Sequence, residues 1–175
     1  MAIDHVSVGV ASMQRSKSFY DAALAPLGMN PVYPVEINGK LVGVGYGADD
    51  NPSFWIQLPI NGQPATMGNG VHIAFRAATR AAVDSFFLAA LEKGGVEDGR
   101  PGLRTEYSPD YYGAFVRDPD GNKIEATLHQ EPKTARAKAP RAKAKTKAKP
   151  AKKVKKAAKR VAKVAKKAKR KAKRR

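Results

Sequence analysis

Two histidines, one glutamate and one glutamine stand at corresponding positions of an internal sequence repeat. A shift of 67 residues places His5 on His72, and a shift of 68 places Gln57 on Glu125. Imidazole and carboxylate groups are common ligands of divalent transition metals. An amide oxygen can act as a neutral ligand or accept a hydrogen bond. These four residues are therefore the first candidates for a functional site, provided that the fold brings them to one surface.

The repeat extends through the residues that separate the two copies. Several small, aromatic and aliphatic residues recur at the shift of 67: Ser18, Phe19, Ala22, Ala23, Leu24 and Gly28 match Ser85, Phe86, Ala89, Ala90, Leu91 and Gly95. Self-similarity over this length indicates two copies of one supersecondary unit.

Each copy is predicted to form a strand, a helix and then three strands. The helices begin after Ser12 and Thr79, which are suitable N-cap residues, and end at Gly28 and at the pair 94–95. The later strands are predicted at 31–37, 41–46, 54–58, 103–107, 112–117 and 123–129. The sequence Asp-Pro-Asp-Gly at 118–121 is typical of the turn between the last two.

The alternation of side chains along each strand predicts where the candidates point. In the first strand Val6, Val8 and Val10 share the face that a helix can cover, so His5 lies on the opposite face. The pattern repeats around His72, which lies opposite Val71, Ile73 and Phe75. Gln57 and Glu125 alternate with apolar residues in the two closing strands. All four candidates are thus expected on the face away from the helices.

With this arrangement, the sequence resembles the vicinal oxygen chelate superfamily, which includes glyoxalase I, extradiol dioxygenases, fosfomycin-resistance enzymes and bleomycin-binding proteins. The segments that carry the resemblance are IDHVSVGV, SKSFYDAALAPLGM, GVHIAF and GAFVRDPDGNKIEATLH. The resemblance implies an α+β fold in which two βαβββ modules form a cupped, incompletely closed mixed sheet barrel.

The resemblance also implies one divalent metal ion in the cup. Its ligands would be His5, His72 and Glu125, with Gln57 as a fourth ligand or a substrate hydrogen-bonder. Two imidazoles and one carboxylate suit Fe, Mn, Co, Ni or Zn, and the open positions would bind two adjacent substrate oxygens. The metal would act as a Lewis acid, and Glu125 would double as a base. Trp55 and Tyr112 are predicted to line the substrate pocket.

Two departures from the family pattern leave the reaction open. Bacterial glyoxalase I has a glutamate where this chain has Gln57, and a glutathione-contacting arginine where it has Gly9. Both differences argue against a standard glutathione-dependent lyase. The sequence therefore predicts a metal-dependent lyase, isomerase or dioxygenase acting on a small substrate with neighbouring oxygens. The alternative is a non-catalytic, resistance-type domain that binds a small molecule.

Charge divides the chain into two parts. Of the 33 lysines and arginines, 23 lie in residues 133–175, which contain no acidic residue, so 10 basic residues face 15 acidic ones before residue 133. The sequence thus predicts a globular domain over 1–132 and a tail over 133–175 that is too polar and too charged to fold alone. The absence of cysteine and of an apolar run of about 18 residues favours a cytoplasmic protein without a membrane span.

The tail resembles those of linker histones and of lysine-rich bacterial histone-like proteins. Phosphate neutralisation requires charge rather than a defined sequence, so the tail predicts binding to nucleic acid or another polyanion and a location at the nucleoid. The positions assigned to this contact are Lys152, Lys153, Lys155, Lys156, Lys159, Arg160, Lys163, Lys166 and Lys167. A homodimer is expected by analogy with family members of this length.

Overall fold

The computed structural model describes residues 3–129; the predicted tail, with its nine assigned cations, lies outside the described residues. The elements follow in the order β1 (Val6–Gly9), α1 (Met13–Leu24), η1 (Ala25–Leu27), β2 (Asn30–Ile37), β3 (Lys40–Ala48), β4 (Asn51–Gln57), β5 (His72–Arg76), α2 (Arg80–Glu92), β6 (Val96–Leu103), β7 (Tyr112–Arg117) and β8 (Lys123–Leu128). The predicted α+β class with two βαβββ modules is confirmed.

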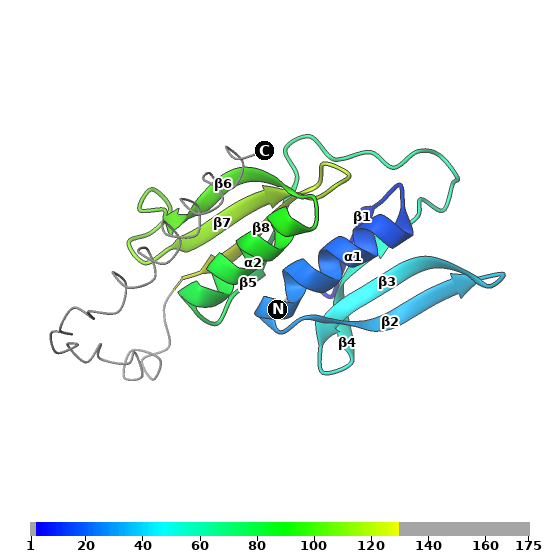
Figure 1. Ribbon diagram of the computed structural model, residues 1–175, viewed down its shortest axis with the longest axis horizontal. Helices are drawn as coiled ribbons and strands as arrows, with labels where there is room; N and C mark the ends of the chain where they lie inside the picture. Colours follow the sequence, from blue (N-terminus) through cyan, green and yellow to red (C-terminus); the bar gives the residue numbers. More distant parts are fainter. Residues whose placement is uncertain (1–2, 130–175) are drawn as a thin grey trace, which may run out of the picture. The chain divides into compact units, whose positions relative to one another are not determined.

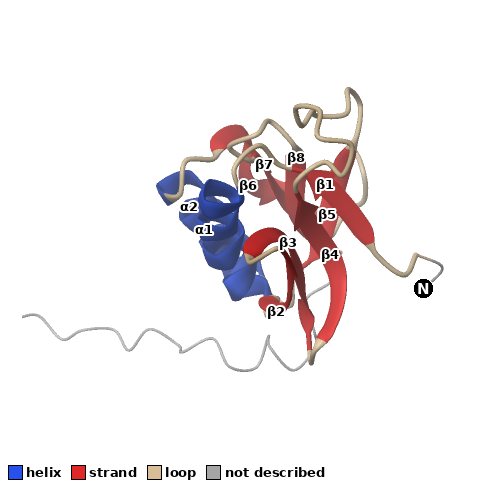
Figure 2. Cartoon of the chain, turned by 90° about the vertical axis from the view of Figure 1, so that its right-hand side faces the viewer, coloured by secondary structure: helices blue, strands red, loops and turns tan. Residues whose placement is uncertain are grey.

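The two modules have the same topology. Their sheets have the strand orders β1-β4-β3-β2 and β5-β8-β7-β6. In each sheet the first strand of the module pairs in parallel with the last, and the remaining pairs are antiparallel. The helices α1 and α2 lie next to each other, with the strands of one module on each side of them in the view of Figure 1. Both helices cover the same side of the strands (Figure 2). The opposite side of the sheets is left free of helices.

Local signals place both helices where the sequence predicts them. The Ser12 hydroxyl accepts a hydrogen bond from the Arg15 amide, and the Thr79 hydroxyl accepts one from the Ala82 amide. After α1, Gly28 has a positive φ of 76°, which glycine adopts without the steric cost of a side chain. None of the helices within residues 3–129 is long and apolar enough to cross a membrane.

The strand predicted at 103–107 is wrong. The structure instead forms β6 at Val96–Leu103, and residues 104–111 make a turn in which the Arg104 carbonyl accepts hydrogen bonds from the amides of Tyr107 and Ser108. Gly99, Pro101 and Gly102 weaken the strand signal of the β6 segment. They are tolerated because β6 is an edge strand whose register shifts around the glycines.

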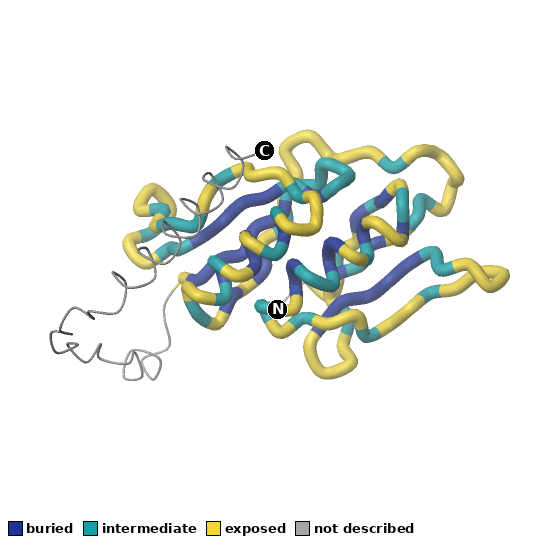
Figure 3. The backbone as a smooth tube through the Cα atoms, in the orientation of Figure 1, coloured by how far each residue is buried: buried dark blue, intermediate teal, exposed yellow. Residues whose placement is uncertain are grey.

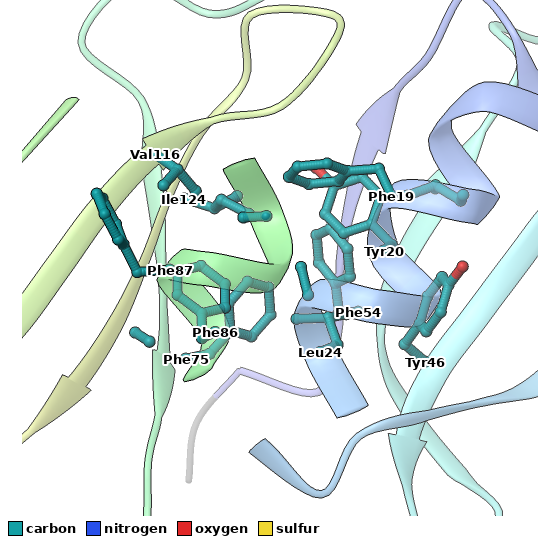
Figure 4. Packing of buried hydrophobic residues seen from close by; sticks show 14 of the residues in the cluster. Phe19, Tyr20, Leu24, Tyr46, Phe54, Phe75, Phe86, Phe87, Val116 and Ile124 are labelled. Carbon is teal, nitrogen blue, oxygen red and sulfur yellow. The ribbon is translucent and has the colours of Figure 1, made fainter. Parts of the chain in front are cut away.

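One hydrophobic core spans both modules. The rings of Phe54 in β4 and Phe75 in β5 meet edge to face, with their centroids 5.0 Å apart. The helices contribute Phe19, Tyr20 and Leu24 from α1 and Phe86 and Phe87 from α2 (Figure 4). Figure 3 shows that the buried residues are concentrated along the central strands and in parts of the two helices. Burying this core therefore requires both modules.

The turn between β7 and β8 ties the second module to the first through Asp118. This side chain is 2% exposed, and its carboxylate accepts a 2.7 Å hydrogen bond from the hydroxyl of Tyr20 in α1. The same carboxylate accepts hydrogen bonds from the amides of Asp120 and Asn122 and from the Asn122 side chain. Asp118 thus shapes its own turn and fixes a fully buried tyrosine of the other module.

Asp120 and Asn122 extend this contact to the start of α1. The Asp120 carboxylate accepts hydrogen bonds from the Ala11 amide, the Arg15 guanidinium and the Ser16 hydroxyl. The Asn122 amide group donates to the carbonyl of Gly9 at the end of β1. We call the turn 118–122 with these partners the intermodule clasp.

Removing the central carboxylate should destabilise the fold. Asp118→Ala leaves the buried Tyr20 hydroxyl and the turn amides without their acceptor, so the free energy of unfolding should fall by about 2–4 kcal/mol. Urea denaturation of the full chain measures the change. Asp110→Ala, an exposed aspartate in the preceding loop, is the control and should change stability by less than about 0.5 kcal/mol. Equal stability of the two variants would contradict the role of the clasp.

Candidate functional site

The strand register collects the polar side chains of the second module on its helix-free face. Lys123, Glu125 and Thr127 alternate along β8 with buried apolar residues. In the parallel pairing with β5, Ala74 lies beside Glu125, and in the antiparallel pairing with β7, Phe115 lies on its other side. Glu125 is therefore central in its sheet, between two neighbouring strands.

The Glu125 carboxylate has a partner at each oxygen. The Tyr111 hydroxyl donates a 2.6 Å hydrogen bond to Oε1, and Nε2 of His72 lies 3.5 Å from Oε2. The Glu125 side chain is 1% exposed, whereas that of His72 is 47% exposed. Glu125 is thus buried beneath Tyr111 and His72, and His72 is the member of this group that reaches solvent.

Glycine at position 113 makes room for this carboxylate. A Cβ atom added at Gly113 would lie 2.7 Å from Oε1 of Glu125 and 3.1 Å from Cε1 of Tyr111. The first distance is too short for any side chain, so a residue larger than glycine would displace the carboxylate or the tyrosine. The Tyr111–Glu125 pair therefore requires glycine at position 113.

The environment opposes ionisation of Glu125 and of Tyr111. Burial raises the pKa of the Glu125 carboxyl, although the hydrogen bond from Tyr111 and the charges of His72, Lys123 and Arg104 lower it. Burial and the bond to Glu125 also raise the pKa of the Tyr111 hydroxyl, against a lowering effect of Thr127. Tyr111 is therefore the proton donor of the pair. A carboxyl with a raised pKa is suited to exchanging protons with a bound molecule.

The structure brings two of the three predicted metal ligands together. His5 precedes β1, with its Nδ1 2.7 Å from Oδ1 of Asp4 and its side chain 54% exposed. Within residues 3–129, no group of three or more histidine, aspartate or glutamate side chains lies close enough to hold a metal ion. Catalytic zinc sites have three protein ligands. As the side chains lie, the described residues do not fit a metal, and no chemical step below is assigned to one.

The remaining predicted site residues lie elsewhere. Gln57 is exposed at the end of β4. The Trp55 ring packs near His5 and Tyr33, with centroid distances of 6.5 and 5.7 Å. Tyr112 points to the helix side, where its hydroxyl donates to Asp84 of α2. Among the described residues, no hydrogen bond or ion pair joins Trp55, Gln57 or Tyr112 to Glu125.

A cavity lies between the first strands of the two modules. Its volume is about 560 Å³, within the range of small-molecule sites. Asp4 and Val6 line it from the first module, and His72, Arg76 and Thr127 line it from the second. A molecule in this cavity can therefore reach His72, the exposed partner of Glu125.

Tyr111 and Thr127 are not among the site residues predicted from the sequence. Tyr111 reaches Glu125 because the turn 104–111 folds back, with the Arg104 amide bonded to the Tyr111 carbonyl. The first part of that turn, 104–107, was predicted as a strand, so the tyrosine that follows could not be placed. Thr127 shares the strand parity of Glu125, and this signal alone could have indicated it.

These features define a domain of two βαβββ modules with a buried carboxylate beneath a histidine that lines an intermodule cavity. Residues 2–126 match the family model described as Glyoxalase/Bleomycin resistance protein/Dioxygenase superfamily. The chain belongs to this superfamily, whose members often bind a metal.

Several solved structures are similar to this chain. A glyoxalase/bleomycin resistance protein from Albidiferax ferrireducens T118 has 42% identity and a TM-score of 0.60, over 71% of this chain and 95% of that one. A Frankia sp. EAN1pec domain of the superfamily has 15% identity and a TM-score of 0.57, over 74% and 98%. A glyoxalase-related enzyme from Fulvimarina pelagi has 17% identity and a TM-score of 0.53, over 73% and 87%. The last two share the fold alone. No curated protein gives a match.

Replacing Tyr111 should change the titration of Glu125. Tyr111→Phe removes the hydrogen bond that favours the ionised carboxylate, so the pKa of Glu125 should rise above its value in the unmodified chain. The carboxyl ¹³C shift of Glu125, followed against pH by NMR in chelator-treated protein, measures it. Tyr107→Phe, whose ring packs against Tyr111 at 5.1 Å, is the matched control and should leave this pKa unchanged. An unaltered Glu125 titration in Tyr111→Phe would refute the pairing.

Proposed function

We propose that this chain is a glyoxalase-like enzyme that moves a proton on a small substrate with neighbouring oxygens, with Glu125 as the base. The observation that carries the proposal is the buried Glu125 carboxylate with its raised pKa, held between Tyr111 and His72. Perturbed carboxyls beside a cavity are frequent catalytic groups. Proton transfer next to a carbonyl is the chemistry that this arrangement supports best.

Each residue has a distinct part in this proposal. Tyr111 occupies Oε1 and fixes the orientation of the carboxylate. Oε2 faces His72, which lines the cavity, so this oxygen would accept the proton of the bound substrate. The exposed imidazole would donate a hydrogen bond to the substrate oxygen on which negative charge develops. Glu125 would then return the proton to the substrate.

The metal predicted from the sequence remains a proposal. His72 and Glu125 are adjacent donors, but His5 would have to leave Asp4 to join them. We propose Fe, Mn, Co, Ni or Zn as the metals to examine, because imidazole and carboxylate ligands suit them. The homodimer expected by family analogy is likewise proposed.

The enzyme proposal is tested by solvent exchange. Transfer of a proton next to a carbonyl should introduce deuterium from D₂O into a panel of small hydroxy ketones, hydroxy aldehydes and hydroxy acids, detected by NMR. Glu125→Gln should slow the exchange by about 10²–10⁴-fold because the base is lost. Glu106→Gln, at an exposed glutamate, is the matched control and should retain the full rate.

Different outcomes would contradict the base and the metal dependence. Exchange by the unmodified chain that is no faster than that of Glu125→Gln across the whole panel would exclude the base. The assay is repeated with a chelator and with each added metal. Full exchange in the chelated protein, or a metal response that survives in His72→Ala, would contradict the proposed metal dependence.

A non-catalytic binding domain is the second candidate. The observation that favours it is the lack of a three-donor metal cluster within residues 3–129. Such a domain would bind a small molecule in the same cavity without exchange of its protons. The comparison of the unmodified chain with Glu125→Gln separates this candidate from the enzyme.

We propose further that residues 133–175 form a separate tail that tethers the domain to nucleic acid. The support is the charge distribution: this segment has 23 cationic residues and no acidic residue, whereas the preceding part is net acidic. Duplex DNA binding driven by phosphate neutralisation loses affinity with a salt slope of about −0.9 per phosphate contacted.

Deletion of the tail should abolish DNA binding. The full chain should bind unrelated duplexes with similar affinity and lose several decades of affinity between about 50 and 200 mM salt. A chain with residues 133–175 shuffled is the matched control and should bind like the natural sequence. Fluorescence anisotropy measures all three proteins. Retained affinity in the truncated chain, or loss in the shuffled one, would contradict the tether.

A further inference from the structure

A buried hydroxyl in the intermodule cavity has no partner. Thr127 is 6% exposed, and its Oγ1 lowers the pKa of the nearby Tyr111 hydroxyl but makes no hydrogen bond of normal geometry within the described part of the chain. Buried hydroxyls normally pair with protein or water, because an unpaired one loses the hydrogen bonds that it makes in solvent. Thr127 also lines the cavity, so a rotation of its side chain would bring this covered hydroxyl to a bound molecule.

An arginine stands beside this hydroxyl. Arg76 pairs with Thr127 in the parallel register of β5 and β8, so the two side chains lie on the same face of neighbouring strands. Arg76 also lines the cavity. Within residues 3–129 it makes no ion pair or side-chain hydrogen bond. Its guanidinium therefore retains the planar set of donors that matches carboxylate and phosphate oxygens.

The donors at this end of the cavity suit an anion. Arg76 is the cationic side chain that lines the cavity, His72 and His129 add imidazole groups, and Asp4 is the acidic residue. The Asp4 carboxylate is held by His5 of its own module. Thr127 follows Glu125 by two residues on β8, a separation of about 7 Å along the strand. A small molecule can therefore contact Thr127 and Arg76 with one end and approach the His72–Glu125 pair with the other.

We propose that Arg76 and Thr127 form an anion subsite, and that the substrate carries a carboxylate or phosphate group a few atoms from its reacting carbon. This inference rests on the proposed function for the role of Glu125. The anion accepts hydrogen bonds from the Arg76 guanidinium and the Thr127 hydroxyl. The subsite selects acids over neutral molecules and orients the carbon toward Glu125.

The test uses the full chain and two anionic probes. Glycolate and inorganic phosphate are titrated at about 150 mM salt, where tail contacts are weakened, with neutral ethylene glycol as the control compound. NMR shifts of the Arg76 Nε–H group and of the Thr127 amide report binding at this position rather than at the tail. At least one anion should shift both signals. The anion that binds more tightly indicates whether the substrate carries a carboxylate or a phosphate. A response to neither anion, or an equal response to ethylene glycol, overturns the subsite.

Three variants connect binding to the named side chains. Arg76→Gln should lower the affinity for the anion about tenfold or more, and Thr127→Val should lower it about fivefold, as expected for lost hydrogen bonds to a charged group. Arg100→Gln, at an arginine that pairs with Glu97, is the matched control and should bind like the unmodified chain. Because the Thr127 hydroxyl has no partner in the free protein, Thr127→Val should not lower the thermal midpoint. Unchanged affinity in Arg76→Gln, or a clear loss of stability in Thr127→Val, contradicts the proposal.

The proposed function and the subsite can fail separately. If Glu125→Gln exchanges substrate protons as fast as the unmodified chain while Arg76-dependent binding persists, the base is wrong and the subsite stands. If exchange requires Glu125 but the KM for acidic substrates is the same in Arg76→Gln as in the unmodified chain, Glu125 is the base and the proposed subsite is wrong.

Discussion

The hydrogen bond between the Tyr20 hydroxyl and the buried Asp118 carboxylate determines how the two modules meet. A carboxylate at this depth is tolerated because the turn amides and the Asn122 side chain also donate to it. The clasp joins the turn between β7 and β8 to the end of β1 and to α1, beside a core that neither module buries alone. The cavity between β1 and β5 follows from this arrangement, because residues of both modules line it.

A second constraint acts within the β7–β8 pair. Glu125 occupies the middle of a sheet, where a charged side chain is unfavourable unless it is paired. Gly113 leaves the space for its carboxylate, and Tyr111 supplies a hydrogen bond that a phenylalanine could not. Burying the Glu125 carboxylate costs desolvation free energy, which its polar partners Tyr111 and His72 partly offset. Such placements are typical of sites where function and stability conflict.

Sequence patterns were sufficient for the features that depend on local periodicity. The repeat, the N-caps Ser12 and Thr79, and the shared face of His72 and Glu125 all follow from spacing and alternation. These features require only the 3.6-residue and two-residue periods of helix and strand. The order of one strand, one helix and three strands in each module was predicted for the same reason, whereas the arrangement of the sheets came from the family resemblance.

Features that depend on turns and long-range contacts could not be predicted in this way. The β6 strand contains glycine and proline, which the edge of a sheet tolerates but periodicity does not reveal. The Tyr111–Glu125 bond depends on the path of the turn 104–111. Parity placed His5 on a common face with His72, but its contact with the adjacent Asp4 is set by side-chain orientation, which alternation does not specify.

The location of the ligand is the central claim, and a crystal structure of the full chain with glycolate tests it most directly. The account predicts electron density in the cavity between β1 and β5, with the carboxylate within hydrogen-bonding distance of Thr127 and Arg76 and the hydroxyl-bearing carbon toward His72. A second cavity, lined by Met67, Val71 and Arg117, lies on another side of His72. Density for glycolate in that second cavity, with the intermodule cavity free of it, would contradict the account.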